Sequence, residues 1–192
     1  METTVRHSST LPNSTASHSA GTSVIYGLHG KCGIEKIESR EIQGSAQEFY
    51  KLVPQKSSFS RSTRQEPAIW IPVNSTLAKS LRPAMGPEQA KEAMTVLLSR
   101  EYYFSLSEAW SSVQPKLEAC IHTEGGIGLA MVASYLLTLK KKQVVASQEV
   151  SRMIEAVNRV LLREISEALG ETIRAIEEKI NKGIKQKLLP DA

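Results

Sequence analysis

The chain changes character near Met85, and this change limits the folds that it can adopt. Residues 21–85 contain short runs of β-branched and aromatic side chains separated by glycine and proline, whereas residues 86–192 are rich in alanine, leucine, glutamate and lysine at helical spacing. Strand-like segments followed by helical segments are typical of an α+β protein. We therefore predict two modules, residues 21–85 and 86–192, preceded by a tail of residues 1–20.

The tail has the composition of a disordered segment. Residues 1–20 contain nine serine or threonine side chains and a single carboxylate, Glu2. They hold few large apolar side chains, so they cannot bury enough surface to offset the entropy of ordering. We expect residues 1–20 to be disordered.

The first module is predicted to be a small, strongly bent sheet. Its strand-like runs are residues 24–26, 33–42, 48–53 and 68–73, and Gly27, Gly30, Gly33 and Gly44 punctuate them. Glycine adopts the positive φ angles that tight turns need, which favours a Tudor-like or SH3-like barrel. The polar insert at residues 55–65 lacks apolar alternation, and we expect a loop between two strands.

The second module is predicted to be a bundle of four or five helices. One helix begins at Gly86-Pro87-Glu88, with proline at its first position and an acidic side chain in its first turn. Apolar stripes at helical spacing predict further helices over residues 126–141, 147–169 and 171–188, and Gly170 is predicted to end the third of these four helices. Pro115 is expected to interrupt helix formation in the segment after Trp110.

The charge is compatible with nucleic-acid binding but does not establish it, and the cysteine content indicates a cytoplasmic protein. The net charge is +4 and the isoelectric point is about 9.1, a mild basic excess. Cys32 and Cys120 fall in different modules of a chain without a secretory signal, so we expect reduced thiols. No run of apolar residues is long enough for a membrane span.

The sequence does not favour an enzyme. His29 with Cys32, and Cys120 with His122, are isolated pairs without further ligands at metal-binding spacing. The chain has no Walker loop, dinucleotide-binding fingerprint, nucleophile elbow or His-Glu-x-x-His motif. We expect no catalysis, no small-molecule substrate and no cofactor.

Four phrases point to a family when they are taken in order. They are VIYGLHG at residues 24–30, IESREIQG at 37–44, IPV at 71–73 and LRPAM at 81–85. Together they resemble the CarD/CdnL family of bacterial RNA polymerase-binding proteins, and the similarity extends through the helical part to about residue 170. The resemblance implies a Tudor-like module that docks on the polymerase β subunit and a helical module that lies against promoter DNA.

The resemblance assigns a docking role to three residues of the first module. In the family an exposed strand edge pairs with the sheet of the β subunit, a mode that uses backbone groups. The basic side chain of the second phrase corresponds to Arg40, followed by Ile42. A second basic position of the family, just before the Pro-Val phrase, is occupied here by Trp70, which is either an aromatic anchor in the same interface or part of the barrel core.

The resemblance also assigns DNA contacts to the helical module. Trp110 corresponds in order to a tryptophan that the family inserts at the edge of the transcription bubble. The family follows this tryptophan with Ser-Arg-Arg, whereas this chain has Ser111-Ser112-Val113, which removes two phosphate contacts. The other basic positions that the resemblance places near DNA are Lys140, Lys141, Lys142, Arg152 and Arg159.

The expected function is therefore regulation of transcription by a monomer that stabilises the open promoter complex. The alternative is a protein adaptor that keeps the polymerase-docking module but binds another protein through its helices. A third possibility is a free-standing relative of the polymerase-docking domain of transcription-repair coupling factors, which would share only the first module.

Overall fold

The computed structural model describes residues 18–55, 67–99, 101, 103–141 and 148–187. Most of the predicted tail, most of the polar insert and Lys142 lie outside these residues, and for Lys141 only the backbone is described. The predictions made for these segments stay predictions.

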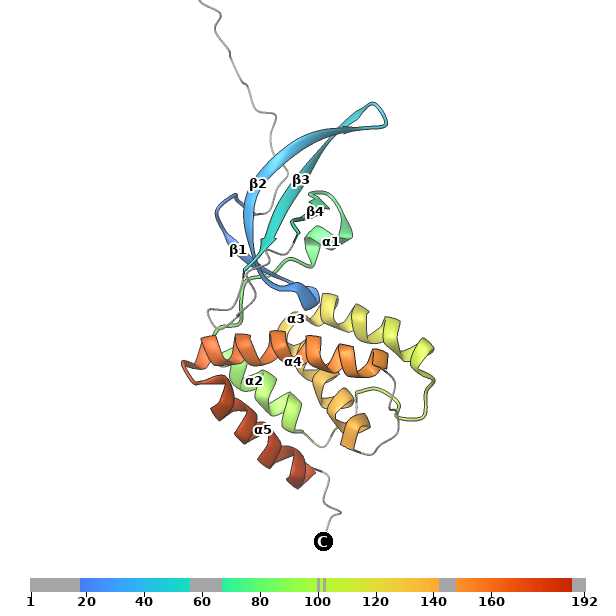
Figure 1. The fold of residues 1–192 in the computed structure, drawn as a ribbon, viewed down its shortest axis with the longest axis vertical. Coiled ribbons are helices and arrows are strands. Elements are labelled where there is room, and N and C mark those ends of the chain that lie inside the picture. The colour runs from blue at the N-terminus through green and yellow to red at the C-terminus, as the bar shows by residue number, and fades with distance from the viewer. Residues whose placement is uncertain (1–17, 56–66, 100, 102, 142–147, 188–192) are drawn as a thin grey trace, which may run out of the picture.

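Four antiparallel strands form one sheet in the order β1-β2-β3-β4. They are β1 (Ser23–Tyr26), β2 (Gly30–Ile42), β3 (Ser45–Pro54) and β4 (Ile69–Pro72). Each strand falls at a predicted run. Beyond their pairing with β1 and β4, β2 and β3 continue as a long hairpin arm (Figure 1). At its tip, Gln43 and Gly44 have φ angles of 52° and 76°, the backbone of a tight two-residue turn.

The two faces of the sheet differ because residues directly opposite in neighbouring strands share a face. Leu52 lies opposite Ile34 and Ile69, and these apolar side chains belong to the inner face. Tyr50, opposite Ile37 and Ile71, extends the same face. Its buried core comprises Val24, Tyr26, Cys32, Ile34, Tyr50, Leu52, Ile71, Val73, Ala78 and Leu81.

The sheet is open among the described residues. β1 pairs on its free side with Arg82, since the Ile25 N–H donates to the Arg82 carbonyl at 2.7 Å and the Arg82 N–H donates back at 3.2 Å. The edge strands β1 and β4 do not pair with each other in the part of the chain that the structure describes. The predicted α+β class is confirmed, with an open antiparallel sheet followed by helices.

The helices are α1 (Thr76–Lys79), α2 (Pro87–Leu98), α3 (Trp110–Lys141), α4 (Gln148–Leu169) and α5 (Ile173–Lys187), and a short 3-10 helix, η1, spans Gly27–His29. α2 begins at Pro87, as predicted. Gly170 follows α4 with a φ of 66°, as expected of a helix-ending glycine. The sequence did not predict α1, whose first turn is capped by the Ser75 hydroxyl, an acceptor for the Ala78 N–H at 3.1 Å.

The prediction that Pro115 interrupts the helix is wrong, because α3 runs through it. Pro115 is exposed and lies in the second turn, where a proline removes one hydrogen bond close to the helix end. The break comes instead at Gly125, with a φ of 60° and a ψ of −123°. Only glycine adopts this backbone conformation without strain.

α3 is also the one helix among the described residues that is long and apolar enough to cross a membrane, over Trp110–Lys140. Its most apolar window is 56% buried, and the break at Gly125 leaves two pieces that are each shorter than the roughly 20 residues of a membrane span. α3 packs against α2 and α4. We therefore assign it as the central helix of the bundle.

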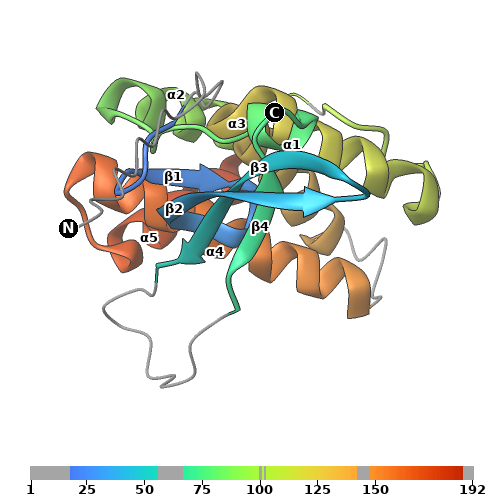
Figure 2. The ribbon, with the colours of Figure 1, turned by 90° about the horizontal axis from the view of Figure 1, so that it is seen from above.

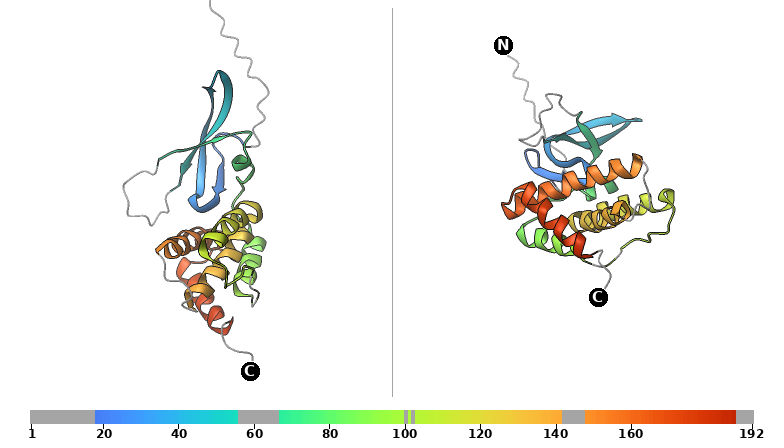
Figure 3. Two further views of the ribbon diagram at one scale, coloured as in Figure 1. Left: turned by 90° about the vertical axis from the view of Figure 1, so that its right-hand side faces the viewer. Right: turned by 60° about the horizontal axis from the view of Figure 1, so that its bottom comes forward.

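The helical core extends to the sheet. It includes Ile25 of β1 and Met85 of the connector, together with apolar residues from α2, α3, α4 and α5. η1 contacts both α3 and α4. The sheet therefore stands on one end of the bundle, with the arm pointing away from it (Figure 3). Seen from above, the strands overlie α3 and α4 (Figure 2).

Candidate functional site

The outer face of the sheet carries a tryptophan surrounded by cations. Lys36 of β2 lies opposite Lys51 of β3, and Lys51 lies opposite Trp70 of β4, so the three side chains form a row across the sheet. Glu38 and Arg40 follow Lys36 at intervals of two and therefore share its face. We call these five residues, Lys36, Glu38, Arg40, Lys51 and Trp70, the Trp70 face.

Arg40 and Trp70, which the sequence assigned to one docking site, are in contact. The Arg40 guanidinium carbon lies 3.4 Å from the centre of the Trp70 ring. The ammonium groups of Lys36 and Lys51 each lie 5.9 Å from the same centre. Each such contact stabilises an exposed site by about 0.5–1 kcal/mol, so the cations hold the ring in place on a surface that water reaches.

A carboxylate positions the basic groups. Glu38 forms an ion pair with Lys36 and accepts a hydrogen bond from Arg40 Nε at 3.1 Å. The hydrogen bond from Lys36 lowers the pKa of Glu38, burial raises it, and Arg40 lowers it further, so that it lies below its ordinary value. On the other side, Lys51 Nζ pairs with a Glu35 carboxylate oxygen at 2.7 Å. The face therefore presents fixed groups of both signs.

Apolar groups and a free strand edge adjoin the Trp70 face. Phe49 is buried on the same face, opposite Glu38 and Pro72. Ile42, further along the arm, is 45% exposed. Among the described residues no strand pairs with the outer edge of β2 between Lys36 and Ile42. A partner strand has open backbone groups to bind there.

The predicted DNA-binding residues do not contact one another as Arg40 and Trp70 do, among the residues that the structure describes. Lys140 is exposed near the end of α3, and Arg152 is exposed on α4. Arg159 lies two helical turns beyond Arg152 and therefore on the same side of α4. Its guanidinium donates to the Leu28 carbonyl of η1 at 3.5 Å, which places it at the junction of sheet and helices.

Trp110 packs against the helical bundle, whereas a side chain that inserts into DNA has to be exposed. It is the first residue of α3, is partly buried, and packs against the helical core. Its indole N–H is buried without a hydrogen-bond partner in the described part of the structure. Nearby, Phe104 packs edge-on against Tyr135, with ring centres 5.5 Å apart. These aromatic groups belong largely to the core.

The charge of the helical module is balanced. Residues 86–192 contain 14 lysine or arginine and 14 aspartate or glutamate side chains, so the net charge of +4 comes from residues 1–85. A phosphate-binding surface needs a local basic excess. The asymmetry is visible in the sequence, but the total charge alone does not reveal it.

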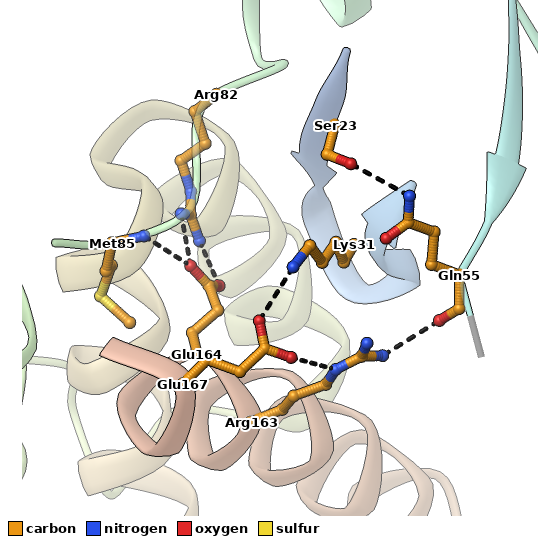
Figure 4. Close-up of polar contacts among 8 residues, drawn as sticks. All are labelled: Ser23, Lys31, Gln55, Arg82, Met85, Arg163, Glu164 and Glu167. Atoms are coloured by element: carbon orange, nitrogen blue, oxygen red, sulfur yellow. Dashed lines mark hydrogen bonds and ion pairs between the residues drawn. The ribbon is translucent and has the colours of Figure 1, made fainter. Parts of the chain in front are cut away.

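The residues that join the two modules were not predicted from the sequence. Arg82 of the connector binds Glu164 of α4 through two hydrogen bonds of 2.7 Å (Figure 4). A signal was present, because Glu164 lies three residues after Leu161 in the apolar stripe of α4. A carboxylate in a buried stripe needs a cationic partner.

Comparison with models of known protein families gives no match, and comparison with curated proteins gives none either. Among the described residues no group of three or more histidine, cysteine, aspartate or glutamate side chains is arranged to hold a metal ion. The site must therefore be interpreted from its own geometry.

Proposed function

We propose that this chain is a transcription regulator similar to CarD/CdnL proteins, and that it docks on the β subunit of bacterial RNA polymerase through the Trp70 face and the adjoining edge of β2. The observation that carries the proposal is the stacking of Arg40 on Trp70 beside an edge of β2 that no strand of the described residues covers. Tryptophan and arginine are the side chains most enriched at the energetic centres of protein interfaces. The free edge supplies backbone donors and acceptors, and the side chains supply selectivity.

The same proposal includes a Tudor-like module. The bridge between Ile25 and Arg82 adds a fifth extended segment beside β1. A short sheet curled in this way supports a partly closed Tudor-like barrel, in which the connector takes the place of a closing strand.

The proposed role of the helical module is to lie against promoter DNA and stabilise the open complex. Lys140, Arg152 and Arg159 supply the phosphate contacts in this proposal. A docked regulator is held near the promoter at a high effective concentration, so a weak DNA contact suffices. The proposal includes a cytoplasmic location and a monomeric state.

The charge balance favours a second candidate, an adaptor whose helical module binds another protein. A module without net positive charge and with Trp110 mostly packed in its core has little to attract a phosphate backbone. The docking role of the Trp70 face is common to both candidates.

The lifetime of the open promoter complex, measured with polymerase and a promoter fragment, separates these candidates. Arg40→Glu places a carboxylate against the Trp70 ring and should abolish polymerase binding and any effect on lifetime. Lys140→Glu combined with Arg152→Glu should shorten the lifetime without affecting polymerase binding if the helices contact DNA. Lys182→Glu, on the exposed side of α5, controls for the change in net charge.

Three results would count against these assignments. Full polymerase binding by Arg40→Glu contradicts docking through the Trp70 face. An unchanged lifetime with Lys140→Glu/Arg152→Glu, while Arg40→Glu removes the effect, supports the adaptor over DNA contact. An absence of polymerase binding by the unmodified protein rejects both candidates.

A further inference from the structure

The connector between the modules is bound on both sides. The Arg82 backbone pairs with Ile25 of β1, and its guanidinium makes the bidentate contact with Glu164 of α4. Glu164 is only 4% exposed and also accepts a hydrogen bond from the Met85 N–H at 3.3 Å. One arginine thus ties the edge of the sheet to the C-terminal part of α4.

A second set of polar contacts joins the strands to the same helix (Figure 4). Lys31 of β2 donates to Glu167 at 3.0 Å, and Arg163 donates to the other carboxylate oxygen at 2.8 Å. Arg163 also donates to the Gln55 carbonyl, just after β3, at 3.0 Å. Arg163 and Glu167, which both lie on α4, therefore bind each other, and each also binds a residue of the sheet module.

Close backbone packing fills the space near these contacts. A Cβ atom at Gly30 would lie 3.3 Å from Val160 of α4, and one at Gly27 would lie 3.1 Å from the His122 ring of α3. A Cβ at Gly125, where α3 breaks, would lie 2.8 Å from Arg82 Cδ. The backbone of β2 at Gly30 and of η1 at Gly27 thus packs closely against side chains of α4 and α3, and the Arg82 side chain packs against the α3 backbone at Gly125.

We propose that Arg82 and Glu164 are positioning residues that fix the angle between the Trp70 face and the helical module. A bidentate arginine–carboxylate pair sets orientation as well as distance. An ion pair of this kind adds little net stability compared with apolar packing, and we infer that here it selects one arrangement of the modules. The inference rests on the proposed function, because a fixed angle matters when docking of one module must bring the other to a defined place.

The consequence is specific. A regulator with freely rotating modules samples many orientations after docking, and its effective concentration at the second site falls. In a regulator whose modules keep a fixed angle, docking of the first module brings the second module to one defined position. Disrupting the pair should therefore leave polymerase affinity unchanged and reduce the effect on the open complex.

The test measures the angle and the effect separately in the full chain. Nitroxide labels at Glu41→Cys on the arm and Lys182→Cys on α5, both exposed positions, report the distance between modules when Cys120 is replaced by serine. With Arg82 and Glu164 unchanged, the two labels should give a single narrow distance distribution. Glu164→Gln, and Arg82→Lys, which keeps the charge but loses the fork, should broaden it. The charge exchange Arg82→Glu/Glu164→Arg should narrow it again in part.

The same variants are then assayed with polymerase. Glu164→Gln and Arg82→Lys should bind it within about twofold of the parent and shorten the open-complex lifetime severalfold toward the value without regulator. Glu178→Gln, which removes a surface ion pair with Arg174 on α5, is the matched control and should change neither readout. Far-ultraviolet circular dichroism verifies that each variant is folded.

The outcomes are distinguishable. A distance distribution as narrow as the parent's in both Glu164→Gln and Arg82→Lys overturns the proposal, and so does a broadened distribution with an unchanged lifetime. If the unmodified protein does not bind polymerase, the proposed function fails, and the distance distributions alone decide whether the pair fixes the angle.

Discussion

Replacing Gly125 with alanine tests whether α3 must break for the modules to join. The backbone at Gly125 has a φ of 60° and a ψ of −123°, a region that costs other residues about 1–3 kcal/mol. An added Cβ would lie 2.8 Å from Arg82 Cδ and 3.1 Å from Nε, so Arg82 has to move. Loss of good geometry in its buried pair with Glu164 adds about 2 kcal/mol.

The expected total is a loss of about 3–5 kcal/mol in the free energy of unfolding. In a chain of this size 1 kcal/mol lowers the melting temperature by about 2–4 °C, so we expect a decrease of about 10 °C. Urea unfolding with constant m-values is the assay for the free energy.

Two controls isolate the contact with Arg82. Gly44→Ala is matched for positive φ, since Gly44 has a φ of 76° but no atom within 4 Å of an added Cβ, and it should cost only about 1–2 kcal/mol. Combining Gly125→Ala with Arg82→Ala should cost less than the sum of the single changes, because the clashing side chain is gone. A Gly125→Ala protein no less stable than Gly44→Ala would refute the reasoning.

Three further predictions follow from the packing and the ionisation of single residues. Gly128→Ala should destabilise the protein by about 3 kcal/mol or more, because its Cβ would overlap the backbone carbonyl of Cys120. Gly183→Ala should change the free energy of unfolding by no more than about 1 kcal/mol, because its Cβ meets only the flexible end of the Leu98 side chain. Equal losses for the two variants in urea unfolding would contradict this prediction. Burial raises the pKa of Glu167, but hydrogen bonds from Arg163 and Lys31 lower it more, so its net pKa is depressed and its contribution to stability is present above about pH 4.5 and lost as the pH falls. The melting temperature of the parent should therefore approach that of Glu167→Gln between about pH 5 and pH 3, and a constant difference across this range would disprove the assignment. Burial, aided by Glu124, raises the pKa of the Cys120 thiol, so Glu124→Gln should speed its alkylation at pH 8 by less than about threefold, and a slower reaction would show that Glu124 does not act on the thiol.

Local patterns located most of the elements, although not α1. Runs of β-branched and aromatic residues between glycines located β2 and β3, and the apolar stripe from Val150 to Ile165 located α4, because these preferences are set by local backbone geometry. Gly170 and Pro87 marked helix ends for equally local reasons, a positive φ and a missing N–H. Pro115 did not interrupt the helix as predicted, because it removes a single hydrogen bond and α3 is stabilised by packing against α2 and α4.

The candidate site depended in part on tertiary structure. Arg40 and Trp70 were predicted to share an interface, but their stacking depends on the strand order β2-β3-β4, which brings together residues far apart in the sequence. Lys36 and Lys51 were not predicted at all, because a lysine on a strand is ordinarily just solvated.

By itself, the sequence determined where strands give way to helices, which faces are apolar, and that the basic excess lies in the first 85 residues. Only the tertiary structure decided that Arg82 meets Glu164, that Gly125 lies against Arg82, and that Trp110 packs into the bundle. The physical reason is the range of the forces involved. Backbone preferences and hydrophobic periods act over a few residues, whereas a buried ion pair or a close glycine contact exists only when the whole chain has folded.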